Sequence, residues 1–477
     1  MKKFLKIFAL CAVFAFAVSI ACSAQEAEKT VVTADKYNFR NVIASIKESC
    51  TLEIVGEIDT KTVKLMGDSL AKLNRKGISI NLDMSKATGL EHIENWSLYD
   101  CGCLKSVILP SGVRIIGKGA FDGANCSTGL HNIIIPDTVK IIGDKVFRCC
   151  IYLEDVVLPN SLEIIGNYAF DTCWSLKNIV IPDSVRSIGN GAFYGCHILE
   201  NITIGSNVEN IGENAFRKCE KIKSITIPAS VEKIGAGAFC NCLNLTEFTV
   251  DENNEHFKIV DGILFSKDES VIVSCIFGND ENSYIIPSSV DIIGDSAFSY
   301  CKHFENIIIP ESVKSIGASA FGACSLKKIT IPDSVQEIGE RAFSGCALES
   351  VTIPAGIETI EKGVFAGCNF KSLIIPANIK TIGQIAFRGC KNLEYVAIQD
   401  GTESIGNQAF VDCGNLKSIT IPATVKCIEK GAFENCTSLE TINFTGTQTQ
   451  WNAIRKSSGW NYRCPSTMKI NYNYTEN

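Results

Sequence analysis

Cysteine is the residue type with the most chemistry open to it in this sequence, because a thiolate is a nucleophile and a metal ligand, and two thiols can form a disulfide. The 477-residue chain has 23 cysteines, an odd number. Twelve of them fill one position of a repeated sequence: Cys150, Cys173, Cys196, Cys219, Cys242, Cys301, Cys324, Cys346, Cys368, Cys390, Cys413 and Cys436. Each could be a metal ligand, a nucleophile, half of a disulfide or a small apolar core residue.

The spacing of these cysteines favours the core role. Equivalent side chains of stacked repeats run parallel about 5 Å apart, so their Cβ atoms do not converge as a disulfide requires. A free cysteine behaves as a small buried hydrophobe. We therefore predict buried free thiols at these positions, and a core role for Cys50, which precedes the repeats.

The other residues that could do chemistry form no cluster in the sequence. The histidines, at positions 92, 131, 197, 256 and 303, are scattered and lack the ligand spacing of a metal site. Cys196 and His197 are adjacent, but neighbouring side chains point in opposite directions in most geometries. No acid, base and nucleophile converge, and there is no glycine loop for a phosphate. The sequence therefore predicts no catalytic residue, no metal and no cofactor.

The elements that must position the cysteines are short repeats. "IVIPDSVRSIGNGAFYGC" from Ile179 recurs as "ITIPASVEKIGAGAFCNC" from Ile225 and "ITIPATVKCIEKGAFENC" from Ile419. The repeat phenylalanines lie at 170, 193, 216 and 239, and again at 321, 343, 365 and 387, so the period is 22 or 23 residues. That period lies in the range of leucine-rich repeats.

One repeat can be interpreted physically in "LKKITIPDSVQEIGERAFSGC", which begins at Leu326. Its first apolar residues alternate inward as a short parallel strand, and Pro332 ends the strand because proline cannot donate to a ladder. Gly339 permits a turn, after which Phe343 and Cys346 point inward from an irregular or 3₁₀ segment. Stacking about 14 such coils predicts a rod or arc about 65 Å long.

The consensus L-x-x-I-x-I-P-x-S-V-x-x-I-G-x-x-A-F-x-x-C resembles the leucine-rich repeat of the BspA-like family, also called the Treponema pallidum type. The resemblance covers residues 86–445, although Gly205, Gln399 and the "SLYDC" start depart from the pattern. It implies an α/β-poor repeat solenoid with one parallel sheet on the concave face and short 3₁₀ or irregular segments on the convex face. It also implies an exported surface protein that binds host matrix proteins or other cells.

Residues 1–24 have the layout of a secretory signal peptide, with three lysines ahead of an apolar run of about 15 residues and then small residues. Two cleavage sites compete. Ser19-Ile20-Ala21-Cys22 resembles a lipobox, with Cys22 as the lipidated residue, whereas ordinary cleavage would follow Ala24. We expect a lipoprotein of the cell surface or outer membrane in the first case and a secreted or periplasmic protein in the second, with a lipid anchor as the only membrane contact.

Three segments do not follow the repeat. Residues 25–85 are predicted to form a small α/β cap, with strands in "CTLEIVG" and "ISINLDMS" and an amphipathic helix opened by Asp59 or Thr60 and closed by Gly77. Residues 243–285 interrupt the period, and Asp261-Gly262 between β-rich runs suggests a hairpin, which is either a binding loop or a structural offset or bend in the solenoid. Residues 446–477 are predicted to close the last coil through Trp451 and Trp460, as in the family.

Charge argues against nucleic acid as a partner, because the formal net charge is −7 and the pI is about 5.5. In one outward column, acid and base alternate along the chain: Lys105, His131, Glu154, Lys177, Glu200, Lys223 and Thr246, then Glu305, Lys327, Glu349, Lys371, Glu394, Lys417 and Glu440. Neighbouring strands lie about 5 Å apart, so opposite charges in such a column attract and like charges repel. Because exposed ion pairs are individually weak, the chief expected gain is the avoidance of repulsion along the column.

The predicted binding surface is formed by one residue from each repeat. This residue points outward between the two inward positions of the strand that begins the repeat. It is aliphatic in four successive copies: Ile108, Ile134, Val157 and Val180. The adjoining outward column would supply a polar rim: Ser106, Asn132, Asp155 and Asn178. Because contiguous apolar surface commonly marks an interaction site, we expect an extracellular or host protein here, of the matrix class implied by the resemblance. The alternative is a structural or self-associating envelope protein.

Overall fold

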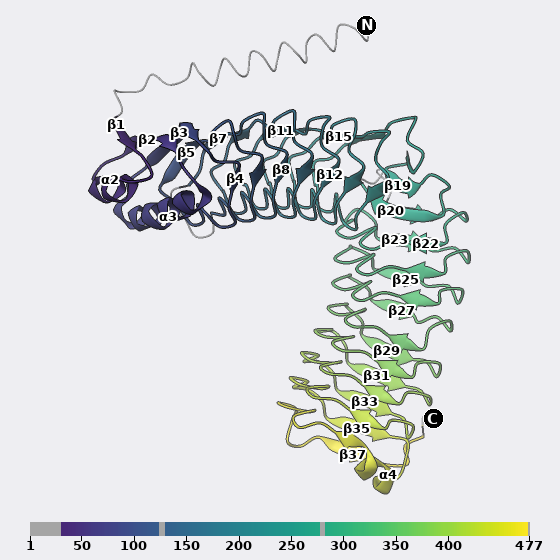
Figure 1. The fold of residues 1–477 in the computed structure, drawn as a ribbon. Helices are drawn as coiled ribbons and strands as arrows, with labels where there is room; N and C mark the ends of the chain where they lie inside the picture. The colour runs from purple at the N-terminus through teal and green to yellow at the C-terminus, as the bar shows by residue number, and fades with distance from the viewer. Residues whose placement is uncertain (1–29, 124–128, 277–281, 476–477) are drawn as a thin grey trace.

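The computed structural model describes residues 30–123, 129–276 and 282–475. The predicted signal peptide and Cys22 lie outside these residues. The described chain is a β-solenoid of stacked parallel strands with few helices, as predicted. It forms two arms that meet at a corner (Figure 1). No helix in the described ranges has the length and apolar character needed to cross a membrane.

A typical coil contributes two short strands, one to each of two parallel ladders. In the coil of "ITIPDSVQEIGERAFSGC" these are β25 (Lys328–Thr330) and β26 (Glu337–Ile338). β25 pairs in register with the first strands of both neighbouring coils, and β26 pairs with the second strand of the coil before. The first ladder matches the predicted sheet. The second ladder was not predicted, because a two-residue strand is too short for its alternation to be recognised.

The N-terminal arm carries both ladders. Its first strands after the cap are β5 (Leu104–Ile108), β7 (Asn132–Ile134), β9 (Asp155–Val156), β11 (Asn178–Val180), β13 (Asn201–Thr203), β15 (Ser224–Ile227) and β17 (Glu247–Val250). Its second strands are β4 (His92–Ile93), β6 (Ile115–Ile116), β8 (Ile141–Ile142), β10 (Ile164–Ile165), β12 (Ser187–Ile188), β14 (Asn210–Ile211) and β16 (Lys233–Ile234).

The C-terminal arm repeats this arrangement. Its other first strands are β21 (Ser283–Ile285), β23 (Asn306–Ile308), β27 (Ser350–Thr352), β29 (Ser372–Ile375), β31 (Tyr395–Ile398), β33 (Ser418–Ile421), β35 (Thr441–Phe444) and β37 (Lys469–Asn471). Its other second strands are β22 (Ile292–Ile293), β24 (Ser315–Ile316), β28 (Thr359–Ile360), β30 (Thr381–Ile382), β32 (Ser404–Ile405), β34 (Cys427–Ile428) and β36 (Arg455–Lys456). Both ladders therefore continue beyond residue 445 into the predicted C-terminal cap.

The repeat phenylalanines form a stack along the inside of each arm. The ring centroids of Phe170 and Phe193 are 5.2 Å apart, and those of Phe321 and Phe343 are also 5.2 Å apart, with nearly parallel planes. These rings are fully buried. Each stacked pair adds about 0.5–1.5 kcal/mol to the stabilisation that comes from burial of its surface, which accounts for phenylalanine at one position in coil after coil.

The N-terminal cap continues the first ladder. β1 (Val31–Ala34), β2 (Cys50–Glu57) and β3 (Ile80–Thr88) are parallel, and β3 pairs with β5. α2 (Phe39–Ser45) and α3 (Thr60–Leu70) accompany them. The Asp59 carboxylate accepts a hydrogen bond of 2.7 Å from the Thr62 backbone N–H, which fixes the start of α3 as predicted. A 3₁₀ turn, η1 (Ala71–Lys76), follows and ends at Gly77, whose φ is +67°.

The interruption is antiparallel, as predicted, but it has three strands in place of two, and we call these three strands together the hairpin. β18 (Phe257–Val260), β19 (Ile263–Ser266) and β20 (Val271–Cys275) pair in that order, and Asp261-Gly262 forms the first turn with positive φ angles at both residues. β20 then pairs in parallel with β22, the second strand of the next coil. Figure 1 shows that the solenoid changes direction here. The hairpin is therefore the element that joins the two arms at the corner.

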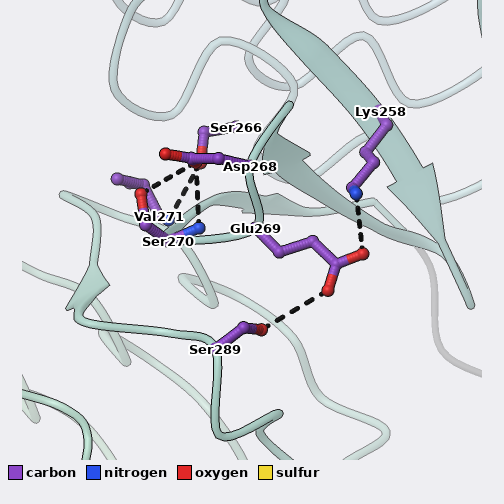
Figure 2. Close-up of polar contacts among 7 residues, drawn as sticks. All are labelled: Lys258, Ser266, Asp268, Glu269, Ser270, Val271 and Ser289. Atoms are coloured by element: carbon purple, nitrogen blue, oxygen red, sulfur yellow. Dashed lines mark hydrogen bonds and ion pairs between the residues drawn. The ribbon is translucent and has the colours of Figure 1, made fainter.

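Asp268 fixes the turn between β19 and β20 (Figure 2). Its carboxylate accepts hydrogen bonds from the hydroxyls of Ser266 at 2.7 Å and Ser270 at 2.8 Å, and from the Ser270 backbone N–H at 3.0 Å. Ser266 Oγ in turn accepts the Val271 backbone N–H at 3.0 Å. These hydrogen bonds, with the Ser266 hydroxyl first, hold the pKa of Asp268 at about 2.

Glu269 links this turn to two neighbouring segments (Figure 2). Its carboxylate forms an ion pair of 2.8 Å with Lys258 of β18 and accepts a hydrogen bond of 3.4 Å from the Ser289 hydroxyl of the next coil. The hydrogen bond and charge of Lys258 hold the pKa of Glu269 below its ordinary value. The polar side chains of the hairpin therefore connect β18 to the first coil of the C-terminal arm.

The C-terminal end is closed by aromatic side chains, as predicted. α4 (Gln448–Ala453) begins with a capping box between Thr447 and Gln450. Trp451 is buried, 5.2 Å from Phe444 and 6.1 Å from Trp460 between ring centroids. The two tryptophans cover the end of the last core layer.

Candidate protein-binding surface

The predicted aliphatic residues lie in one column on the outside of the first ladder of the N-terminal arm. Ile134, Val157 and Val180 are 55%, 62% and 57% exposed, whereas Ile108 is half-buried. Ile108 has a neighbour on each side in the ladder. Asp83 of the cap strand β3 pairs with it on one side, and Ile134 pairs with it on the other. We expected this column on a concave face, but the N-terminal arm is nearly straight in Figure 1, so the prediction of a concave surface was wrong for this arm. We call the outward side chains of β5, β7, β9 and β11, together with Val157, which follows β9, the first-strand face.

The predicted polar rim follows the same register. Ser106, Asn132, Asp155 and Asn178 are aligned across β5, β7, β9 and β11. The Ser106 hydroxyl donates to Asn81 Oδ1 at 2.8 Å, and the Asn201 side-chain amide donates to Asn178 Oδ1 at 2.6 Å. These two hydrogen bonds restrict Ser106 and Asn178, the end members of the rim, before any partner arrives.

The column with alternating charge forms ion pairs in the C-terminal arm. Lys327 lies 2.9 Å from Glu305, and Glu394 lies 2.6 Å from Lys417 and 4.0 Å from Lys371. The hydrogen bond and charge of Lys417 hold the pKa of Glu394 below its ordinary value. In the N-terminal arm, no ion pair joins two members of this column among the described residues.

The twelve repeat cysteines are buried free thiols, as predicted. Eleven of them donate to the backbone carbonyl of a repeat phenylalanine in the preceding coil, at Sγ···O distances between 2.8 and 3.4 Å. Burial raises the pKa of Cys173, Cys219 and Cys368 well above the ordinary thiol value. These thiols are therefore core donors and not nucleophiles.

We call the twelve repeat cysteines the cysteine ladder. Cys301 is the one of the twelve whose thiol faces a carbonyl other than that of a repeat phenylalanine, namely that of Cys275. Its thiol and that of Cys275 lie beside His303, and the three ligand atoms are all within 4.8 Å of one another. Sequence spacing did not predict this cluster, because Cys275 comes from the interruption and reaches the others only through the return of the hairpin. The available signal was the Cys301-x-His303 spacing beside a second cysteine at the end of a β-rich run.

Comparison with family models identifies the repeats. The model for the BspA type leucine rich repeat region, with 6 copies, matches residues 78–183, 140–268, 270–368 and 336–461. Comparison with curated proteins found no match.

Solved structures of repeat proteins resemble this chain. A leucine rich cell surface protein from Faecalibacterium prausnitzii is 26% identical, with 84% of this chain and 86% of that chain covered and a TM-score of 0.48. A leucine-rich repeat protein from Bacteroides ovatus is 28% identical, with 80% and 87% covered and a TM-score of 0.45. The pneumococcal vaccine antigen PcpA is 20% identical, with 83% and 86% covered and a TM-score of 0.50, which is a likeness of fold. Because the family model matches well over half of the sequence, the chain belongs to the BspA-type leucine-rich repeat family.

Proposed function

We propose that this protein is an exported cell-surface scaffold, without enzymatic activity, that binds an extracellular protein through the first-strand face and acts as an adhesin. The observation that carries the proposal is the exposure of Ile134, Val157 and Val180 in successive coils. β-propensity explains the threonines at the same position of the next three coils, since branched residues suit any strand. It does not explain three neighbouring aliphatic side chains facing solvent.

The energetics of this face fit a binding site. Covering three half-exposed aliphatic side chains contributes about 1 kcal/mol each, or about 3 kcal/mol together. That is about a hundredfold in the dissociation constant. The neutral column and its polar rim favour an uncharged apolar segment of a protein partner. We place that partner in the class of host matrix proteins, as the family resemblance implies.

Export and surface location rest on the first 24 residues and on the family. The similar protein from Faecalibacterium prausnitzii is a cell surface protein, which is the location that we propose for this chain. Lipidation at Cys22 would anchor the mature chain. We expect Cys22→Ala to abolish fatty-acid labelling and to move the protein from the membrane fraction to the soluble fraction. Unchanged partitioning would favour ordinary cleavage after Ala24.

The binding proposal is tested with charge substitutions on the first-strand face. Replacing Ile134 and Val157 by lysine should weaken binding to the matrix protein selected in a screen by at least tenfold. It should leave the melting temperature nearly unchanged, because both side chains are exposed. The matched control replaces Thr226 and Thr249, which are exposed at the same position of two later coils, by lysine.

The control variant should bind as the wild type does. Equal losses in both variants would mean a general effect of charge, and equal affinity of the folded Ile134/Val157 variant would move the site elsewhere. Sedimentation of the wild type distinguishes the alternative function. A dimer that the Ile134/Val157 variant fails to form, with no matrix protein bound, would identify a self-associating envelope protein.

A further inference from the structure

We propose that Cys275, Cys301 and His303 form a binding site for a thiophilic divalent cation, represented by Zn²⁺, at the corner between the two arms. The site uses two thiolates and one imidazole. This inference does not depend on the first-strand face or on adhesion, because it concerns other residues and a different ligand.

The donor set and its dimensions suit zinc. Zn²⁺ binds cysteine sulfur at about 2.3 Å and histidine nitrogen at about 2.0–2.1 Å in a tetrahedral arrangement, which puts the ligand atoms about 3.6–3.8 Å from one another. Cys275 Sγ lies 3.9 Å from His303 Nε2, and all three ligand atoms lie within 4.8 Å of one another. Small side-chain movements therefore bring the three atoms to coordination distance.

The backbone explains why these two thiols differ from the rest of the ladder. The Cys301 thiol faces the carbonyl of Cys275, where the other ladder thiols face the carbonyl of a phenylalanine. The Cys275 backbone N–H donates to the Ala297 carbonyl, as repeat phenylalanines donate to the alanine of the next coil. Cys275 therefore takes the place of a repeat phenylalanine. A thiol at this position presents a donor atom where the other coils have a ring.

The hydrogen bonds of these two thiols are also the weak ones. The Cys301 Sγ···O distance is 3.9 Å, whereas the other eleven ladder thiols have distances of 2.8–3.4 Å. The Cys275 thiol likewise makes a long contact, with its Sγ 3.9 Å from His303 Nε2. Coordination to a cation would replace two long hydrogen bonds, while the same change elsewhere in the ladder would break good ones.

The position of the cluster gives the cation a structural role. Cys275 ends β20 of the hairpin, while Cys301 and His303 belong to the first complete coil after it. His303 is the partly exposed member of the three, so the cation can enter from its side and take a water molecule as fourth ligand. Bound there, the cation would join the hairpin to the C-terminal arm.

The test uses the full mature chain, purified with a reductant and stripped with a chelator, and titrated with Co²⁺ as a spectroscopic probe. We expect one equivalent to bind with the absorption of tetrahedral thiolate-bound Co²⁺ and to be displaced by one equivalent of Zn²⁺. Cys275→Ser should abolish the signal, and His303→Asn should weaken binding at least tenfold. The matched control, Cys324→Ser, removes the next thiol of the ladder and should bind as the wild type does.

Four results would overturn the site, three of them in the titration of the reduced protein. The first is a wild type without thiolate-bound Co²⁺. The second is equal binding by the wild type and His303→Asn, the variant that decides the question if Cys275→Ser does not fold. The third is loss of binding in Cys324→Ser, which would show unspecific binding along the ladder. A Cys275–Cys301 disulfide in protein isolated without reductant, combined with no Co²⁺ binding after reduction, would also contradict the proposal.

Discussion

The two arms are built from the same repeat but differ in what they present to solvent. The N-terminal arm carries three exposed aliphatic side chains in successive coils, at Ile134, Val157 and Val180. The C-terminal arm has one such pair, Ile285 and Ile308, which are 68% and 50% exposed. It also has the ion pairs of the charged column, which the N-terminal arm lacks among its described residues. Stacking therefore constrains the interior alone, and each arm is free to carry a different surface.

The cores of the two arms are separate at the corner. The buried residues form two clusters, and consecutive residues of β19, Ile263 and Leu264, belong to different ones. Polar and aromatic contacts join residues of the two arms near the corner. Cys240 Sγ lies 3.6 Å from the carbonyls of Ser296 and Ser299, and the Arg217 guanidinium lies 5.2 Å from the ring centre of Tyr300.

The largest expected effect tests this separation. Phe193→Ala and Phe343→Ala each remove a fully buried ring from one phenylalanine stack. Each should cost about 3–5 kcal/mol of unfolding free energy. Because stability in a solenoid depends on neighbouring coils, we expect faster amide hydrogen exchange in the arm that carries the substitution. Denaturant unfolding followed by circular dichroism measures the loss, and exchange mass spectrometry locates it.

Uniformly faster exchange in both arms would show that the corner transmits the damage and that the two cores unfold as one. The same experiment compares the arms directly, because Phe193 and Phe343 have equivalent neighbours on both sides.

The comparison also shows what the sequence could reveal. The period, the buried phenylalanines and cysteines, the cap helix at Asp59 and the tryptophan closure were predictable, because each depends on local spacing and stacking. The partial burial of Ile108 was not, since it depends on the cap strand β3. The approach of Cys275 to His303 was not predictable either, because it depends on the path by which the hairpin returns to the solenoid.

The second prediction concerns the corner and pH. The pKa of Asp268 is about 2 in the folded protein, below the ordinary value of 3.8. Its stabilising effect is therefore fully present above the ordinary value and is lost as the pH falls through the range from 3.8 to about 2. We expect Asp268→Asn to lower the melting temperature at pH 6. The difference in melting temperature between this variant and the wild type should become smaller as the pH approaches 2.

The matched control for this measurement is Asp251→Asn in the N-terminal arm. Asp251 accepts turn hydrogen bonds from the backbone and the side chain of Asn253 on an exposed segment before the hairpin. A difference between wild type and Asp268→Asn that is constant over the whole pH range would contradict the role of the Asp268 charge.

The smallest expected effect sharpens the comparison of the two surfaces. Glu394→Gln removes the carboxylate that Lys417 and Lys371 share in the C-terminal arm, whereas Glu154→Gln changes the same column in the N-terminal arm, where no ion pair holds it among the described residues. Exposed ion pairs contribute little to stability and are screened by salt. We therefore expect Glu394→Gln to lower the melting temperature slightly at low ionic strength and to have no effect at high ionic strength. Glu154→Gln should leave the melting temperature unchanged at both. Calorimetry at two salt concentrations measures both variants. If the two substitutions behave alike, the alternation of charge in the C-terminal arm avoids repulsion along the column without adding attraction, and the two arms differ in their apolar surface alone.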